Sequence, residues 1–183
     1  MNDSLEELYE QFLQQPSGDR FLTLSQLILT ERRNLRAIQD WRRIQSSFRK
    51  GDFEWLIQES WEFIPAWLLA PRFHQILADA AEKTRDSEME ELEQFQLQQC
   101  LEGLMDTGEG SQPHPYHVVS TSDIHDIMAA LDKTPVAQHC VQGHESLCDL
   151  VSCDDGSELW FRPIDMAIAP YQAATEEPTL QRT

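Results

Sequence analysis

The chain has 183 residues and a formal net charge of −18 at pH 7. A hydrophobic content of 40%, with five Trp and eight Phe, is typical of a folded protein and excludes a fully disordered chain. The negative charge repels nucleic acid and anionic membrane surfaces, so we predict that the protein binds neither.

The amino-terminal segment, Met1 to Glu7, is acidic and lacks the apolar stretch of an export signal. The longest apolar run, Phe63 to Pro71, is interrupted by Pro65 and is too short to cross a bilayer. We therefore predict a cytoplasmic protein. Its four Cys residues are expected to be thiols, because the cytoplasm is reducing.

Apolar residues recur at three- and four-residue steps through the first hundred positions, which predicts a series of amphipathic helices. The first two stripes run from Leu5 to Leu13 and from Phe21 to Ile28. The third stripe, Leu35 to Phe48, ends before Gly51, and Asp52 is placed to cap the next helix. A connection this short makes the third and fourth helices an antiparallel hairpin.

A second hairpin is predicted after the fourth helix. The fourth stripe, Phe53 to Ile64, includes Trp61 among the positions expected to be buried. The fifth stripe runs from Phe73 to Ala80, and a capping box of Ser87 and Glu90 opens the sixth helix. The apolar face of this sixth helix is predicted at Met89, Leu92, Phe95 and Leu104.

Turn-forming residues from Asp106 to Pro115 separate the helical part from a smaller part with a different composition. Pro135 favours the sheet edge for the strand that follows it, because Pro has no N–H to donate to a neighbour. The elements predicted in this part are a strand at Tyr116–Ser120, a helix that starts at Thr121, and strands at Val136–Val141, Leu147–Cys153 and Leu159–Phe161, the last two joined by a turn at Asp154–Gly156.

The predicted fold class is therefore α+β. Residues 1–106 are predicted to form irregular hairpins like those of tetratricopeptide repeats, because two hairpins follow one another at the expected spacing but bulky residues stand at the helix contacts. Residues 107–165 are predicted to form a small α/β domain, an antiparallel sheet with one helix. Residues 166–183 have no apolar period and are predicted to be a flexible tail.

Several short segments carry a resemblance to known proteins: Pro71–His74, Cys100–Gly103, Thr107–Ser111, Pro115–Val119, Ser122–Asp123, Cys148–Asp149, Cys153–Gly156 and Trp160–Phe161. This set resembles a family of uncharacterised bacterial proteins that combine tetratricopeptide-like helices with a small α/β domain. The likeness covers residues 70–165 well and the amino-terminal third loosely. It implies this architecture and an intracellular bacterial setting, and it implies no activity.

Most of the His and Cys residues lie in the second part of the chain. His139, Cys140, His144, Cys148 and Cys153 are donor types that zinc prefers, but their spacing lacks a Cys-x2-Cys pair. Successive residues of a strand face opposite sides, so His139 and Cys140 do not readily share one ion. We therefore predict small core residues at these Cys positions, and no metal site.

Residue types of a catalytic triad occur close together in the sequence, but triads are recognised by geometry and not by closeness in sequence. These residues are Ser111, His114, His117, Asp123 and His125. We predict no catalytic residue and no cofactor, and we favour a protein that is not an enzyme. A basic cluster is interpreted as the solvated face of helices, with a docking patch for an acidic partner as the alternative. The cluster contains Arg32, Arg33, Arg36, Arg42, Arg43, Arg49 and Lys50.

The leading functional hypothesis is an adaptor or scaffold that binds a protein partner. Trp55 and Trp67 fit their stripes least well, and exposed Trp side chains are common anchors, although packing between the two parts is the alternative interpretation. Tyr116 begins a strand whose edge can hold a protein segment. The rival hypothesis is a small-molecule or metal-dependent activity at the seam between the parts, where three His residues could converge. These residues are His114, His117 and His144.

Overall fold

The computed structural model describes residues 3–31, 36–64, 66–144 and 146–164. The predicted tail, residues 166–183, lies outside these ranges. The helical part contains α1 (Asp3–Gln14), α2 (Gly18–Glu31), α3 (Arg36–Lys50), α4 (Phe53–Glu59), the 3-10 helix η1 (Ser60–Phe63), α5 (Pro71–Thr84) and α6 (Ser87–Met105). The remainder contains β1 (Tyr116–Val118), α7 (Thr121–Ala130), β2 (Pro135–Gln142), β3 (Leu147–Cys153) and β4 (Glu158–Pro163).

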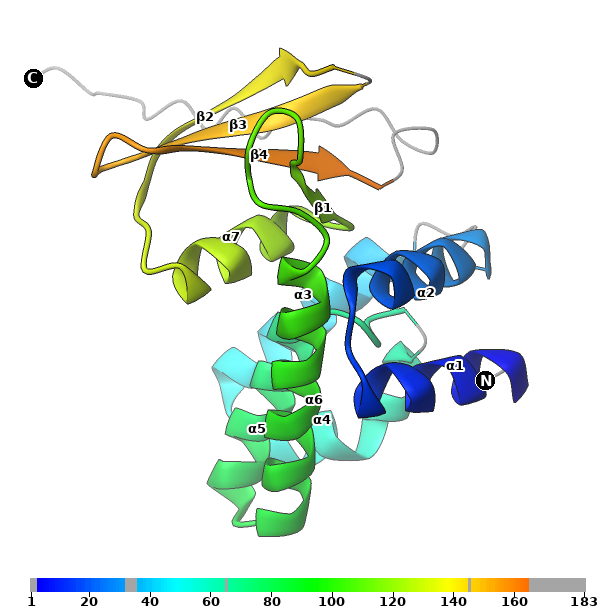
Figure 1. Cartoon of the computed structure of the whole chain (residues 1–183). Coiled ribbons are helices and arrows are strands. Elements are labelled where there is room, and N and C mark those ends of the chain that lie inside the picture. Colours follow the sequence, from blue (N-terminus) through cyan, green and yellow to red (C-terminus); the bar gives the residue numbers. More distant parts are fainter. Residues whose placement is uncertain (1–2, 32–35, 65, 145, 165–183) are drawn as a thin grey trace, which may run out of the picture.

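The α+β class is confirmed, and Figure 1 shows the sheet at one end of the molecule with α7 between it and the other helices. The two tight helix connections each use a residue in the left-handed conformation, Gly51 with φ 79° and Arg85 with φ 62°. This conformation ends a helix and lets the chain fold back. Within the described ranges, none of the helices has the length and apolar content that crossing a membrane requires.

The fourth predicted helix changes its winding before it ends. The α-helical part stops at Glu59, and the 3-10 helix η1 continues to Phe63. A 3-10 helix turns by about 120° per residue instead of about 100°, so its side chains leave the stripe of the α-helix. Phe63 is buried as a result, and Trp61 is 68% exposed. The prediction that Trp61 faces the interior is therefore wrong.

The sixth helix is correctly placed, but its cap and its buried face differ from the prediction. Asp86 is the N-cap, and its carboxylate accepts the N–H of Met89 at 3.1 Å. Leu92 and Phe95 are exposed, whereas Glu93 is buried. The buried residues of α6 are Glu93, Cys100, Gly103 and Leu104.

The cap assignment gives a direct prediction. Replacing Asp86 with Ala should lower the free energy of unfolding by about 1 kcal/mol, because the N–H of Met89 loses its acceptor. Ser87→Ala is the matched control and should change it by less than about 0.5 kcal/mol. Urea denaturation of the two variants measures both values. A larger loss for Ser87→Ala would restore the capping box predicted from the sequence.

A buried ion pair explains why a glutamate faces the interior. His74 of α5 lies 2.7 Å from Glu93 (Nδ1 to Oε2) and 2.9 Å from the carbonyl oxygen of Leu68 (Nε2 to O). Both ring nitrogens face acceptors, so both must carry hydrogen and the imidazole is a cation. Burial alone lowers the pKa of His74, but Cys100 and Glu93 outweigh it and raise the pKa to about 10.

The sheet has the order β1-β4-β3-β2. The antiparallel meander of β2, β3 and β4 is as predicted, and β2, which starts with Pro135, is at an edge. The prediction of a wholly antiparallel sheet is wrong, because β1 pairs with β4 in parallel, with Tyr116 opposite Phe161. The α7 helix and strands β2 and β3 lie between these two strands in sequence, which gives the chain the length to return in the same direction.

The main hydrophobic core is shared by the helices and the sheet. Phe12 and Phe21 of the first two helices belong to one cluster with Ile127 of α7 and Phe161 of β4. A second, smaller cluster joins α3, α4, η1 and α5 around Phe63.

Candidate functional site

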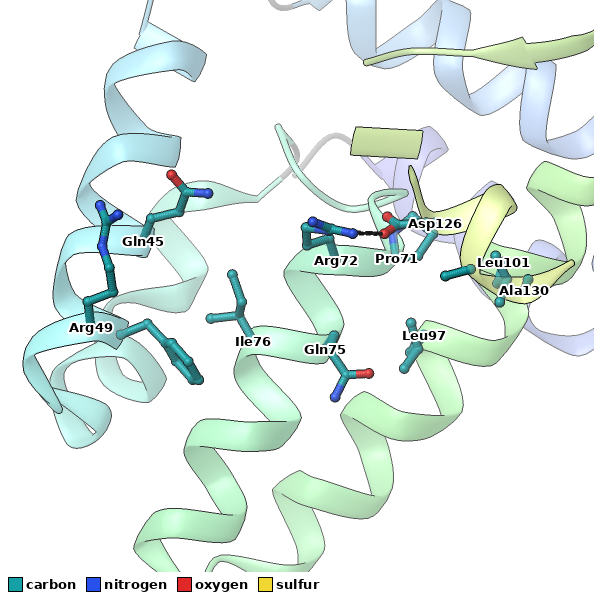
Figure 2. Close-up of a pocket in the computed structure, with 12 residues that line it drawn as sticks. Gln45, Arg49, Pro71, Arg72, Gln75, Ile76, Leu97, Leu101, Asp126 and Ala130 are labelled. Atoms are coloured by element: carbon teal, nitrogen blue, oxygen red, sulfur yellow. Dashed lines mark hydrogen bonds and ion pairs between the residues drawn. The ribbon is translucent and has the colours of Figure 1, made fainter. Parts of the chain in front are cut away.

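A groove opens between α3, α5, α6 and α7, and Figure 2 shows it in close-up. We call it the helical groove. Its volume is about 560 Å3, within the range of about 300–1,000 Å3 that is usual for ligand sites. Most of its lining is apolar: Phe48, Pro71, Ile76, Leu97, Leu101, Ala129 and Ala130.

An ion pair forms the polar wall of the helical groove. Arg72 of α5 donates to one oxygen of Asp126 of α7, Oδ1, at 3.0 Å from Nε and 2.7 Å from Nη2. The side chain of Asp126 is 12% exposed and that of Arg72 is 41% exposed. Arg72 is therefore held at one end by Asp126, while much of its guanidinium faces solvent.

The environment of Asp126 sets the charge of this wall. Burial raises the pKa of Asp126, and the hydrogen bonds and charge of Arg72 offset part of that rise. Its second oxygen, Oδ2, is buried and has no hydrogen-bond partner among the described residues. Arg72 therefore stabilises the charged carboxylate of Asp126, and the two hydrogen bonds hold the guanidinium of Arg72 in one position.

A second arginine lies across the helical groove on α3. Arg49 is exposed, and no carboxylate of the described residues lies within ion-pair distance of it. Figure 2 places it on the opposite side from Arg72, next to Gln45 and beyond Ile76. An apolar floor between two guanidinium groups suits a ligand that is apolar along one face and carries carboxylates on its flanks.

The three residues predicted to anchor a partner lie outside the helical groove. Trp55 is half-buried, its ring 6.2 Å from that of Phe63, with Arg43 above it at 5.5 Å. Trp67 is half-buried, 4.8 Å from the ring of Trp41. Tyr116 is buried in the main core, 5.8 Å from the ring of Phe161.

The His residues of the rival hypothesis do not line one cavity. His114 is exposed in the loop before β1, and the Nδ1 atom of His117 lies 3.2 Å from the carbonyl oxygen of Thr107. His144 borders a separate pocket with Cys148 and Arg162. Among the described residues, no three His, Cys, Asp or Glu side chains form a group that could hold a metal ion. All four Cys residues are free thiols. Cys148 and Cys153 are buried as predicted, whereas Cys140 is exposed, so the prediction of a core residue there is wrong.

Asp123, the acidic residue of the triad considered from the sequence, has a structural role. Asp123 uses its carboxylate to cap α7, in a capping box with Ser120. Its oxygens accept the N–H groups of Val119 and Ser120 at 2.7 and 2.9 Å and the Ser120 hydroxyl at 2.9 Å. The hydrogen bonds of the Asp123 carboxylate therefore stabilise the start of α7. Among the described residues, this carboxylate accepts no hydrogen bond from a His side chain, whereas the Asp of a catalytic triad does.

Comparisons of the chain with models of known protein families, with curated protein sequences and with solved structures found no match. The resemblance to bacterial proteins with tetratricopeptide-like helices stays a prediction.

The residues that form the helical groove were not singled out as a set from the sequence. Arg49 belongs to the basic cluster, for which a docking patch was the alternative interpretation. Arg32, Arg33 and the side chain of Arg36, from the same cluster, lie outside what the structure describes. The feature of the sequence that pointed to the groove was therefore this basic cluster in a chain of negative net charge. It indicated only the side of the groove that contains Arg49.

Proposed function

We propose that this protein is a non-enzymatic interaction protein that holds a segment of a protein partner in the helical groove. The observation that carries the proposal is an apolar groove of about 560 Å3 in a chain of net charge −18, with the exposed Arg49 on one side and the half-buried Arg72, paired with Asp126, on the other. The positive groups are local exceptions to the overall field. They select for carboxylates at this place, although the rest of the surface repels them.

The occupant that fits is an amphipathic helix of the partner. Its apolar side chains, at i, i+3, i+4 and i+7, would lie on Phe48, Ile76 and Leu97, which line the floor between the helices. Acidic side chains on its flanks would reach Arg49 and Arg72. Two arginines on opposite sides also fix the register of the segment, because each requires a carboxylate at its own distance along the helix.

The helical groove is a better binding surface than the edge of β1. That strand has three residues, and its Tyr116 and Val118 side chains are buried. Strand addition gains its affinity from main-chain hydrogen bonds along an edge, and three residues offer few of them. The helical groove instead offers apolar area together with charge.

A partner captured from a cell lysate should be lost when the helical groove is changed. Arg49→Glu should weaken binding about tenfold or more, because it places a carboxylate against the acidic flank. Ala129→Trp, at an exposed residue that lines the groove, should block it without disturbing the core. Affinity purification followed by titration of the recovered partner measures both effects.

Lys50→Glu is the matched control for the arginine change. Lys50 is the next residue, is also exposed and also lies in the last turn of α3, but it does not line the helical groove. Both variants change the net charge equally and remove a cation from the same helix end. A partner that is retained by Arg49→Glu and Ala129→Trp, or lost equally with Lys50→Glu, does not bind in the groove.

A further inference from the structure

A second cavity lies where α2, the segment that leads into α5 and the start of α7 meet. We call it the seam cavity. Its volume is about 230 Å3, and it shares no lining residue with the helical groove. Cavities of about 150 Å3 take benzene, and sites for drug-sized ligands start at about 300 Å3. The seam cavity therefore suits a molecule with one substituted ring.

The wall of the seam cavity is mainly apolar. Its apolar members come from α2, from the segment before α5 and from the residue that follows β1, so no single element builds it. Trp67, one of the residues predicted to bind a partner, contributes an aromatic ring to this wall. The larger apolar residues are Ile28, Leu29, Trp67, Leu69 and Val119.

The side chain of Ser25, in this wall, has no hydrogen-bond partner among the described residues. Ser25 belongs to α2 and is 1% exposed. A hydroxyl in a helix usually bonds a carbonyl of the preceding turn, as Thr30 does with the carbonyl oxygen of Gln26 at 2.7 Å. Buried hydroxyls left without a partner are few in folded proteins. Ser25 therefore presents an unused donor and acceptor at the cavity.

The carboxylate of Asp123 and the hydroxyl of Ser120, which also line the cavity, already form hydrogen bonds. Asp123 accepts three hydrogen bonds, from the N–H groups of Val119 and Ser120 and from the Ser120 hydroxyl. Burial raises the pKa of Asp123 to about 6, against the effect of these hydrogen bonds, so its carboxylate is mostly charged at pH 7. A negative charge in the wall disfavours an anionic ligand.

Water alone is a poor occupant of this cavity. A buried water needs two to four polar partners, and most of the residues in this wall are apolar. We propose that the seam cavity binds a small, uncharged, mainly apolar molecule with one hydroxyl group, and that this group hydrogen bonds to Ser25. The proposal goes beyond the adaptor function and does not depend on it.

A pair of probes that differ in one hydroxyl tests this proposal. Binding of 4-ethylphenol and of ethylbenzene is followed by NMR, from the methyl signals of Ile28, Leu69 and Val119. We expect the phenol to bind about tenfold more tightly than ethylbenzene. In Ser25→Ala the two probes should bind equally, because the variant keeps the apolar wall and lacks the hydroxyl.

Two further variants separate a bound ligand from a change in the fold. Ala66→Leu, which fills part of the cavity, should abolish binding of both probes. Thr30→Ala removes an exposed hydroxyl from the same helix and should leave both affinities unchanged. The proposal is overturned if neither probe binds, if Ser25→Ala retains the tenfold preference, or if tyramine or 4-ethylbenzoate binds more tightly than 4-ethylphenol.

Discussion

Replacing Glu93 with Gln should lower the free energy of unfolding by about 3–5 kcal/mol at pH 7. The change keeps the shape of the side chain and removes its charge. It leaves the cationic ring of His74 buried, with the Leu68 carbonyl as a neutral partner. A buried charge without its counterion is among the most destabilising defects in a protein interior. Glu91→Gln is the matched control, because Glu91 is exposed on the same helix.

The same pair gives the protein a pH-dependent stability with a defined sign. The pKa of His74 is raised from 6.5 to about 10 in the folded protein, so the folded state binds the proton more tightly than the unfolded state. The stabilisation is fully present below pH 6.5 and is lost as the pH rises through about 10. Tyr9 and Cys100, which also face this pair, are unchanged in Glu93→Gln.

Urea denaturation between pH 6 and pH 10 measures this effect. The quantity compared is the free energy of unfolding against pH, for the native protein and for Glu93→Gln. The native protein should lose stability across this range, and Glu93→Gln should lose less, because the carboxylate of Glu93 raises the pKa of His74 together with Cys100. Equal slopes for the native protein and the variant would show that the imidazole is not held as a cation. A loss below about 1 kcal/mol at pH 7 would contradict the assignment of a buried ion pair.

The parts of this fold that were predictable from the sequence are those with local causes. Gly51 ends α3 because it adopts a positive φ that most residues avoid. Pro135 places β2 at the sheet edge because it has no N–H to donate to a strand on that side. In both cases the residue itself, and not a distant contact, determines the structure.

The errors have causes that are distant in sequence. Glu93 reads as a surface residue of α6, because the His74 that neutralises it is nineteen positions away on another helix. Once Glu93 is inside, Leu92 and Phe95 must point elsewhere on the same helix. Trp61 reads as buried under a constant helical period, and the switch to a 3-10 turn breaks that period.

The helical groove could not be predicted because its lining has no common sequence pattern. Arg72 and Asp126 are 54 positions apart, and each is an ordinary charged residue in its own helix. Their pairing depends on how α7 packs against α5, which is a property of the tertiary fold. The seam cavity has the same origin, since Ser25 lacks a partner only in the assembled structure.

Replacing Phe161 with Ala should lower the free energy of unfolding by about 3–5 kcal/mol. Phe161 is fully buried in the central strand β4 and belongs to the main core with residues of α1, α2 and α6. Its removal leaves a cavity between the sheet and the helices, which a close-packed core fills only in part. Trp160→Ala is the matched control, because Trp160 is the next residue, is half-buried and faces the other side of the sheet. Its cost should be smaller.

The number of transitions in the unfolding curve shows whether the helical part, residues 1–106, and the α/β part, residues 107–165, unfold together or separately. Because one core joins them, helical circular dichroism and the NMR signals of the sheet should disappear in a single transition, and Phe161→Ala should shift both together. Two transitions, with the helices still melting at the native midpoint in Phe161→Ala, would show that residues 1–106 fold independently. In that case the seam cavity would lie between two domains and would open with their separation. A single transition would make it part of one cooperative unit, and a ligand that binds there would stabilise the whole described chain.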